Sequence, residues 1–213
     1  MLTKLLRATV QKITLPIGRG IAAAGVTANH MTLLGAAIVF VSAGLIAGGR
    51  PFVGGFVMLG GAAFDMLDGA VARARSDPGK FGAFLDSTLD RLSDGVVLGS
   101  IAMYLLSEPP SSLLVTAGLE VGTSSLVYFG VGITLICMVL GFLTSYIRAR
   151  AEGLGYSCAV GIAERTERTL LLAVGLIVPR MLLVSLSALA VVSAITVVQR
   201  FVHVWSQART SRG

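Results

Sequence analysis

The sequence is most informative at residues 65–90, which read DMLDGAVARARSDPGKFGAFLDSTLD. Two pairs of aspartates stand here in largely apolar surroundings. Asp65 and Asp68 are three residues apart, and Asp86 and Asp90 are four apart, so each pair shares one face of a helix. The connection between the pairs is short. We therefore expect two antiparallel helices that present four carboxylates to each other at one depth.

The rest of the chain is unusually apolar for its length. Of its 213 residues, 54% are hydrophobic and only 13% are charged, and the mean hydropathy is +0.84. Soluble domains carry about 25% charged residues. A soluble fold of this size has too little interior for so much apolar surface, so we predict an all-α membrane protein, with residues 1–213 forming a single membrane domain. The two cysteines, Cys137 and Cys158, are predicted to be unpaired thiols.

Six stretches are predicted to span the membrane as helices, since about 30 Å of hydrocarbon needs roughly 20 helical residues. They lie near residues 31–49, 52–73 and 82–106, then in a stretch that ends near Ile147, and finally near 169–178 and 181–203. Residues 113–122 fit either a loop or the start of the fourth helix, and 148–168 are predicted to be mainly a loop. Residues 1–12 predict an amphipathic helix on the membrane surface, in an interfacial segment 1–28 before a six-helix bundle at 29–205.

The positive charges support an even number of spans. With six spans, both termini lie on one side of the membrane, and fifteen of the 17 Lys and Arg residues fall on that side. Only Arg50 and Arg180 fall on the opposite side. Cytoplasmic loops carry the excess of Lys and Arg. We therefore expect cytoplasmic termini in a multi-pass protein of the plasma membrane, with the aspartate cluster on the cytoplasmic side.

Four carboxylates on two facing helices indicate a cation site. Charged groups inside a membrane are unfavourable by several kcal/mol and usually mark function. Carboxylates this close repel one another unless some are protonated or cations lie between them, and hard oxygen ligands suit Mg²⁺ or Mn²⁺. Two other readings are open. One alternative is that the aspartates are solvated residues at helix ends, an interpretation that suits Asp77 and is considered for Asp94. The other is that the protein is a divalent-cation transporter.

The motif also resembles a known signature. Asp65, Asp68, Gly69, Ala72, Arg73, Gly82, Asp86 and Asp90 match all eight fixed positions of D-x2-D-G-x2-A-R-x8-G-x3-D-x3-D, the signature of the CDP-alcohol phosphotransferases. The resemblance implies six transmembrane helices, a homodimer, and transfer of a substituted phosphate from a CDP-linked donor to an alcohol with release of CMP. It also implies two Mg²⁺ or Mn²⁺ ions held by Asp65, Asp68 and Asp86 with help from Asp90, which acts as general base.

The same resemblance assigns residues to the donor, CDP-diacylglycerol. Gly69 and Arg73 are expected to lie against the cytidine diphosphate, where a side chain at position 69 would block close approach. Residues 27–32 are similar to the family's T-P-N-x-x-T segment, with Ala28 in place of proline. The alternative for this segment is a helix N-cap. The donor-binding residues expected on these grounds are Asn29, Thr32, Gly69, Arg73 and Gly79.

The acceptor is predicted from basic residues after the fourth span. The segments around Arg150, Arg168 and Arg200 resemble those of actinobacterial phosphatidylinositol-phosphate synthases, and an acceptor with a phosphate dianion needs arginines. We therefore expect inositol phosphate as acceptor, with no role for nucleic acid. The alternatives are that these arginines only fix the topology, or that the acceptor is glycerol 3-phosphate, as in phosphatidylglycerophosphate synthase.

Overall fold

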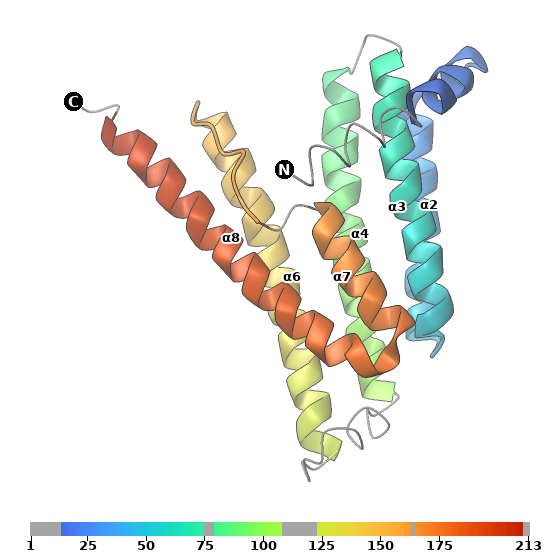
Figure 1. Cartoon of the computed structure of the whole chain (residues 1–213), viewed down its shortest axis with the longest axis vertical. Coiled ribbons are helices and arrows are strands. Elements are labelled where there is room, and N and C mark those ends of the chain that lie inside the picture. Colours follow the sequence, from blue (N-terminus) through green and yellow to red (C-terminus); the bar gives the residue numbers. More distant parts are fainter. Residues whose placement is uncertain (1–13, 75–78, 108–122, 163–164, 211–213) are drawn as a thin grey trace.

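The computed structural model describes residues 14–74, 79–107, 123–162 and 165–210. This part of the chain contains helices and short connections, and no strand. A helix over residues 14–23 comes first. It is followed by α2 (Ala28–Ala47), α3 (Pro51–Ala74), α4 (Lys80–Ser107), α6 (Thr123–Gly153), α7 (Arg165–Ile177), the 3-10 turn η1 (Pro179–Met181) and α8 (Leu182–Thr210) (Figure 1).

The start of α2 shows why one of the sequence motifs is there. The hydroxyl of Thr27 accepts a hydrogen bond from the backbone N–H of His30, and the His30 ring accepts one from the Thr27 N–H. This reciprocal pair is a capping box, which satisfies N–H groups that a helix start leaves unpaired. The N-cap alternative for residues 27–32 is therefore confirmed at Thr27.

Glycines allow α2 and α3 to pack closely. A Cβ added at Gly61 would lie 2.6 Å from a methyl of Val39, and one at Gly35 would lie 2.9 Å from Asp65 Oδ1. The Ser42 hydroxyl donates to the Gly54 carbonyl across the same contact, at 2.7 Å. Small residues bring membrane helices close enough for such contacts. The Gly35 contact matters for function because it places the backbone of α2 directly against Asp65.

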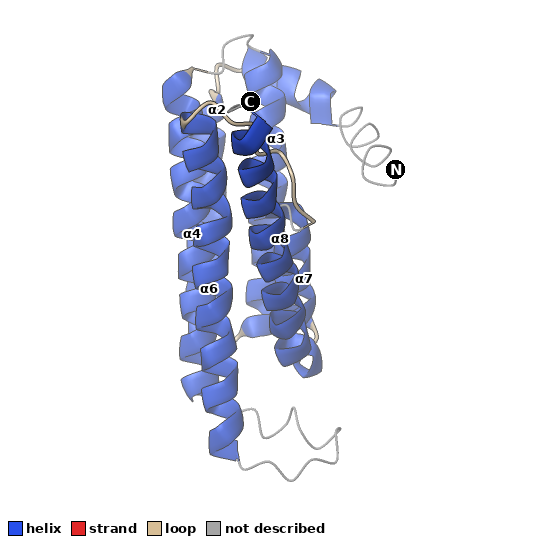
Figure 2. Ribbon diagram, turned by 90° about the vertical axis from the view of Figure 1, so that its left-hand side faces the viewer, coloured by secondary structure: helices blue, strands red, loops and turns tan. Residues whose placement is uncertain are grey.

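The helices form two groups, α2 with α3 and α4, and α6 with α8, which are joined by α7 and by the contact between α4 and α6. The α2 helix packs on α3 and α4, α6 packs on α4 and α8, and α7 packs on α3 and α8. Successive helices alternate in direction, and the 13-residue α7 begins only partway along the bundle (Figure 1). Residues 154–162 run back from the end of α6 alongside α8 towards α7 (Figure 2). This return of the chain brings the start of α7 to the middle of α3 and α4.

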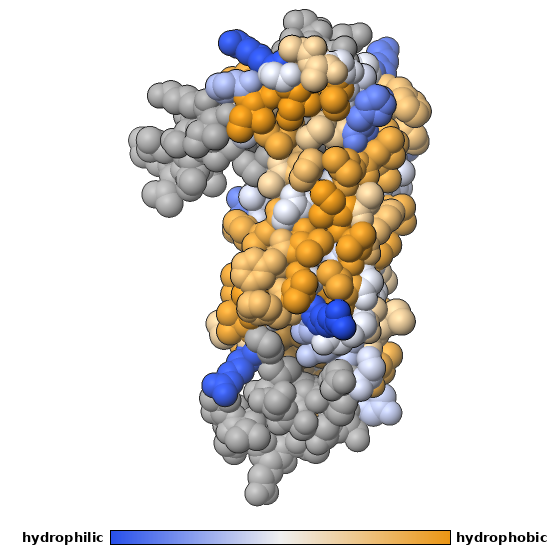
Figure 3. Space-filling model, turned by 90° about the vertical axis from the view of Figure 1, so that its right-hand side faces the viewer, coloured by the Kyte–Doolittle hydropathy of each residue, from blue (hydrophilic) through white to orange (hydrophobic). Residues whose placement is uncertain are grey.

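The outer surface fits a membrane environment. Many large apolar side chains are exposed on the helices, and Figure 3 shows a broad hydrophobic band between more hydrophilic ends. Within the described residues, α2, α3, α6 and α8 are long and apolar enough to cross a membrane. The α4 helix carries four charged residues in its first half and α7 is short, so neither is among them. An all-helical, multi-pass membrane protein is therefore supported, and the count of six crossings stays a prediction.

The predicted boundaries are accurate for α3 and α4 and wrong near residue 150. The α6 helix continues to Gly153, and Arg148 Nε donates to Glu152 Oε1 at 2.8 Å, a pair one turn apart that adds a small stabilisation to this last part of the helix. Residues 148–153 are thus helical rather than loop, and α7 already begins at Arg165. The stretch 113–122 and the predicted surface helix at 1–12 lie outside the described residues.

Candidate active site

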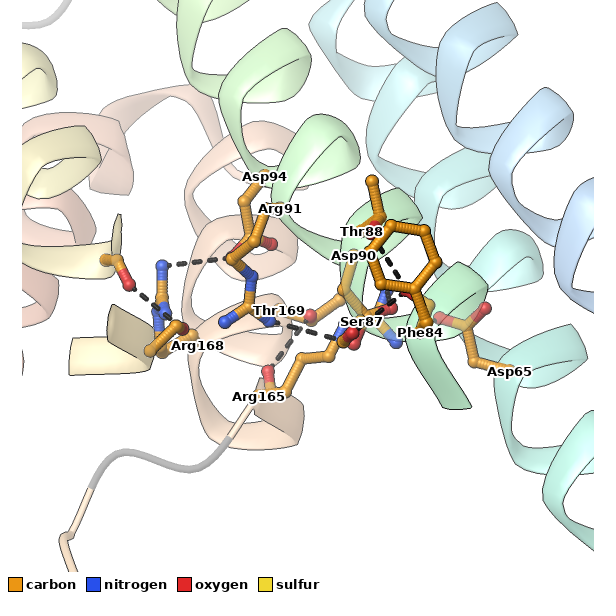
Figure 4. A network of polar contacts seen from close by, with 12 residues as sticks. Asp65, Phe84, Ser87, Thr88, Asp90, Arg91, Asp94, Arg165, Arg168 and Thr169 are labelled. Atoms are coloured by element: carbon orange, nitrogen blue, oxygen red, sulfur yellow. Dashed lines mark hydrogen bonds and ion pairs between the residues drawn. The ribbon is translucent and has the colours of Figure 1, made fainter. Parts of the chain in front are cut away.

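Three helices bring charged side chains together where α7 begins. The α3 helix contributes Asp65, α4 contributes Asp90 and Asp94 one turn apart, and α7 contributes Arg165 and Arg168 (Figure 4). The backbone of α7 packs on α3 and α8. Its long arginine side chains extend from there to the aspartates of α4. The site therefore depends on the chain returning between α6 and α7.

Arg165 bridges two of the aspartates in the sequence motif. Its Nη1 lies 2.6 Å from Asp65 Oδ2 and its Nη2 lies 2.8 Å from Asp90 Oδ1. The two carboxylates are mostly buried, with 16% and 14% of their side chains exposed. An arginine guanidinium stays protonated in proteins, and two carboxylates face this one. Arg165 is therefore a permanent cation between α3 and α4.

Arg168 forms a second contact one turn along α7. Its Nη2 lies 3.2 Å from Asp94 Oδ2, and only 9% of the Arg168 side chain is exposed. On its other side the guanidinium lies directly against Gly141 of α6, where any Cβ would collide with it. Asp94 is thus a paired, partly buried residue, and the interpretation of it as a solvated helix end is wrong.

A polar cavity of about 500 Å³ opens beside this network. Asp90 contributes a carboxylate to its wall. Five arginines also line it, which is a dense positive charge for one cavity, and they are Arg91, Arg148, Arg165, Arg168 and Arg200. Such a lining suits an anionic ligand, since guanidinium groups match the geometry of phosphate and carboxylate.

Two side chains of α8 hold the returning segment 154–162 against that helix, beside the cavity. Arg200 Nε donates to the Val160 carbonyl at 2.8 Å, and its Nη1 donates to the Thr144 carbonyl of α6 at 2.5 Å. Two turns later, the Gln207 amide exchanges hydrogen bonds with the backbone of Ser157. Arg200 is therefore both a cavity residue and a structural link between α6, α8 and the returning segment.

The predicted acceptor arginines fall into two groups. Arg168 and Arg200 line the cavity, whereas Arg150 is exposed on α6 and is not among the lining residues. Arg148, two residues earlier, lies in the wall instead. The prediction for Arg150 stays a prediction.

Arg165 was not predicted, although its spacing of three residues from Arg168 places both on one helix face. In the structure Arg165 contacts the two distant aspartates, and Glu167 Oε2 is buried without a hydrogen-bond partner among the described residues.

The structure describes the side chains of some of the predicted donor-binding residues. Asn29 of α2 lies beside Gly82 of α4, where an added Cβ would be 2.9 Å from the Asn29 amide oxygen. Thr32 is buried and its hydroxyl donates to the Ala28 carbonyl at 3.0 Å. Gly79 is exposed just before α4.

The remaining motif residues lie on the two facing helices. Gly69 and the backbones of Asp68 and Arg73 belong to α3, but the side chains of residues 68 and 73 lie outside the described part. Asp86 is half-buried on α4, one turn before Asp90.

The chemistry of the donor set fits divalent cations. The carboxylates of Asp65 and Asp90 come from different helices and share one cationic group, the Arg165 guanidinium. No group of three His, Cys, Asp or Glu side chains close enough to hold a metal ion is found among the described side chains, which do not include that of Asp68. Oxygen-only ligands of this kind are those that Mg²⁺ and Mn²⁺ prefer.

Comparisons with known proteins agree with this picture. Residues 25–210 match the model of the CDP-alcohol phosphatidyltransferase family. The chain is 35% identical to archaetidylinositol phosphate synthase of Methanothermobacter thermautotrophicus, over 94% of this chain and 93% of that protein. It is 38% identical to phosphatidylinositol phosphate synthase of Mycobacterium tuberculosis, over 94% of this chain and 89% of that protein.

Solved structures of the M. tuberculosis enzyme are similar as well. The structure with CDP-DAG bound superposes with a TM-score of 0.75 at 36% identity, covering 91% of this chain and 94% of that one. The structure in complex with manganese and citrate superposes with a TM-score of 0.74 at 37% identity, covering 90% of this chain and 88% of that one.

Proposed function

The chain belongs to the CDP-alcohol phosphatidyltransferase family, and from this premise we propose that it transfers the phosphatidyl group of CDP-diacylglycerol to a hydroxyl of inositol phosphate. The products are phosphatidylinositol phosphate and CMP. The observation that carries the proposal is the cavity with five arginines beside Asp90, because it offers an anion site next to a carboxylate that can act as a base. The names of the relatives, archaetidylinositol phosphate synthase and phosphatidylinositol phosphate synthase, both denote a lipid product with an inositol phosphate headgroup and support the same acceptor.

The carboxylates of Asp65, Asp68, Asp86 and Asp90 are proposed to hold two divalent ions, Mg²⁺ or Mn²⁺. The manganese complex of the M. tuberculosis enzyme supports this part of the proposal. When bound, such ions neutralise the charge of a pyrophosphate and of the departing nucleotide. Gly69, Arg73 and Asn29, with Thr32 and Gly79, are proposed to bind the donor, and the CDP-DAG complex of that relative supports this donor class.

Asp90 is proposed to remove the proton of the acceptor hydroxyl. Its carboxylate is 14% exposed and forms part of the cavity wall, with Oδ1 in contact with Arg165 and Oδ2 3.7 Å from Arg91 Nη2. A general base must lie within hydrogen-bond reach of the proton it accepts. The acceptor phosphate would then be held by Arg168 and Arg200, with Arg91 and Arg148 adding positive charge nearby. This division keeps the acceptor's dianion away from the carboxylate cluster.

The alternatives from the sequence are weaker. A cation transporter needs carboxylates along a path, whereas the described ones gather with arginines at one site, and family membership makes the protein a transferase. A glycerol 3-phosphate acceptor would use the same arginines, and the experiment below distinguishes it from inositol phosphate.

We also propose that the enzyme works as a homodimer in the plasma membrane, with both termini and the active site facing the cytoplasm.

The test is transfer of radiolabelled phosphatidyl group from CDP-diacylglycerol by purified protein, with inositol phosphate, free inositol and glycerol 3-phosphate supplied side by side. We expect transfer to inositol phosphate to be at least about a hundredfold faster than transfer to either of the other two acceptors. That ratio corresponds to about 2.7 kcal/mol. Equal or faster transfer to glycerol 3-phosphate would replace the proposed acceptor while leaving the reaction class intact. Transfer to free inositol alone would contradict the role given to the arginines.

A further inference from the structure

Among the described aspartates, Asp94 alone lies outside the eight-position motif. It follows Asp90 by one turn of α4, and 23% of its side chain is exposed. Its charge is matched by Arg168, whose Nη2 lies 3.2 Å from Asp94 Oδ2 in an ion pair without hydrogen-bond geometry. Nothing in the proposed chemistry uses this carboxylate, and a carboxylate held this deep in an apolar bundle requires an explanation.

Asp94 and Gly141 hold Arg168 from two sides. Asp94 attracts the guanidinium from α4, and Gly141 gives it room against α6 because it has no Cβ. Arg168 Nε is buried without a hydrogen-bond partner among the described residues, so the side that faces away from the cavity is held by packing and by Asp94. The same residue lines the polar cavity. Its position is therefore set by Asp94 and Gly141, while the residue still contributes positive charge to the cavity wall.

The order of the contacts adds a second consequence. Arg165 pairs with Asp90, and Arg168 pairs with Asp94 one turn further along both helices (Figure 4). If Asp94 lost its charge, the next carboxylate of α4 towards the cavity would be Asp90. Asp90 already has two guanidinium neighbours, because Arg165 Nη2 lies 2.8 Å from its Oδ1 and Arg91 Nη2 lies 3.7 Å from its Oδ2. A third guanidinium would crowd the carboxylate oxygens that a ligand in the cavity has to reach.

We propose that Asp94 is a positioning residue, which keeps Arg168 directed at the phosphate of the acceptor and away from Asp90. The proposal rests on the proposed function, because it needs a phosphorylated acceptor in the polar cavity. It concerns specificity for that acceptor, and it assigns no contact between Asp94 and either substrate.

The first test is a double-mutant cycle between Asp94→Asn and Arg168→Gln. We expect Asp94→Asn to raise the KM for inositol phosphate at least about tenfold, as for loss of a charge-assisted contact, with the KM for CDP-diacylglycerol within about threefold. On an Arg168→Gln background the same change should alter the acceptor KM less than about twofold, because the two residues act as one unit. Asp94→Glu, which keeps the negative charge, should bring the acceptor KM back close to the wild-type value.

The second test moves Arg168 without removing any charge. Gly141→Ala places a methyl group where the Arg168 guanidinium lies, whereas Gly132→Ala on the same helix has no atom within 4 Å of the added Cβ and is the matched control. We expect Gly141→Ala to raise the acceptor KM about as much as Asp94→Asn does, and Gly132→Ala to leave it unchanged. Thermal unfolding midpoints of all variants in detergent show whether an effect comes from misfolding.

The outcomes separate this inference from the proposed function. The acceptor is established first with the wild-type protein, and the cycle is then measured with whichever phosphorylated acceptor it uses. Independent effects of Asp94→Asn and Arg168→Gln on the acceptor KM would overturn the positioning role, as would an unchanged KM in both Asp94→Asn and Gly141→Ala. A wild-type protein that uses only an unphosphorylated acceptor would overturn the proposed function and this inference together.

Discussion

Replacing Arg165 with glutamine removes the cation that joins α3 to α4. The two contacts that are lost are 2.6 Å to Asp65 and 2.8 Å to Asp90. A hydrogen bond to a charged group contributes about 1.5–3 kcal/mol, but about a third of the Arg165 side chain is exposed, so solvent screening reduces the sum. We estimate a loss of about 3 kcal/mol in the free energy of unfolding. For a chain of this size that corresponds to a fall of about 6–12 °C in the unfolding midpoint.

The assay is thermal unfolding of purified protein in detergent, first with EDTA and then with Mn²⁺. With EDTA, Arg165→Gln removes the cation from both carboxylates and leaves Asp90 only the longer contact with Arg91, so the full destabilisation is expected. With Mn²⁺ the cation binds the variant's carboxylates without competing with the guanidinium. Binding at a hundredfold excess over Kd stabilises by about 2.7 kcal/mol. Mn²⁺ should therefore raise the midpoint of the variant by more than it raises that of the wild type.

Arg180→Gln is the matched control, because Arg180 is exposed in η1 at the opposite end of the bundle. A substitution at such a site changes stability by less than about 0.5 kcal/mol. The reasoning is refuted if Arg165→Gln unfolds at the wild-type temperature in EDTA, since the bridge would then contribute nothing. Equal Mn²⁺ effects on both proteins would show that Arg165 and the cation do not share these carboxylates.

Further predictions concern the metals, the base and the topology. EDTA should abolish transfer, and added Mg²⁺ or Mn²⁺ should restore it; full activity in chelator would contradict the cation site. Asp90→Asn should stop turnover while CDP-diacylglycerol still binds, whereas a loss of donor binding as severe as in Asp65→Asn would make Asp90 mainly a metal ligand. Cysteines introduced at Arg50 and Thr210 should be labelled from opposite sides of the membrane, and labelling of both from outside the cell would disprove the six-span topology.

The parts of the fold that sequence predicts well are those with local signals. The helices that carry the aspartates, α3 and α4, agree with their predicted bounds to within two residues because long apolar runs are interrupted there by short polar turns. The capping pair of Thr27 and His30 is likewise local. The end of α6 was placed six residues early, because hydropathy falls at Arg148 although the helix continues to Gly153.

The sequence indicates several residues of the site, including Arg168 and Arg200 in the cavity wall, but not the contacts that they make. Spacing within one helix places carboxylates on a shared face, and the motif therefore identified them. The contacts of Arg165 and Arg168 depend on how far residues 154–162 run back before α7 starts, which no local pattern encodes. The role of Gly141 is equally hidden, since the residue it accommodates is 27 positions away in the sequence.

The short length of α7 has a consequence for the surrounding lipid. A helix of 13 residues is about 20 Å long, whereas the hydrocarbon core of a bilayer is about 30 Å thick. Leu170 and Val174 are exposed along α7, so in the predicted topology acyl chains contact this helix directly. Hydrophobic mismatch of this size is relieved when the adjacent bilayer thins. The lipid headgroups next to α7 would then lie deeper than elsewhere, which shortens the path of a lipid substrate from its leaflet to the carboxylates.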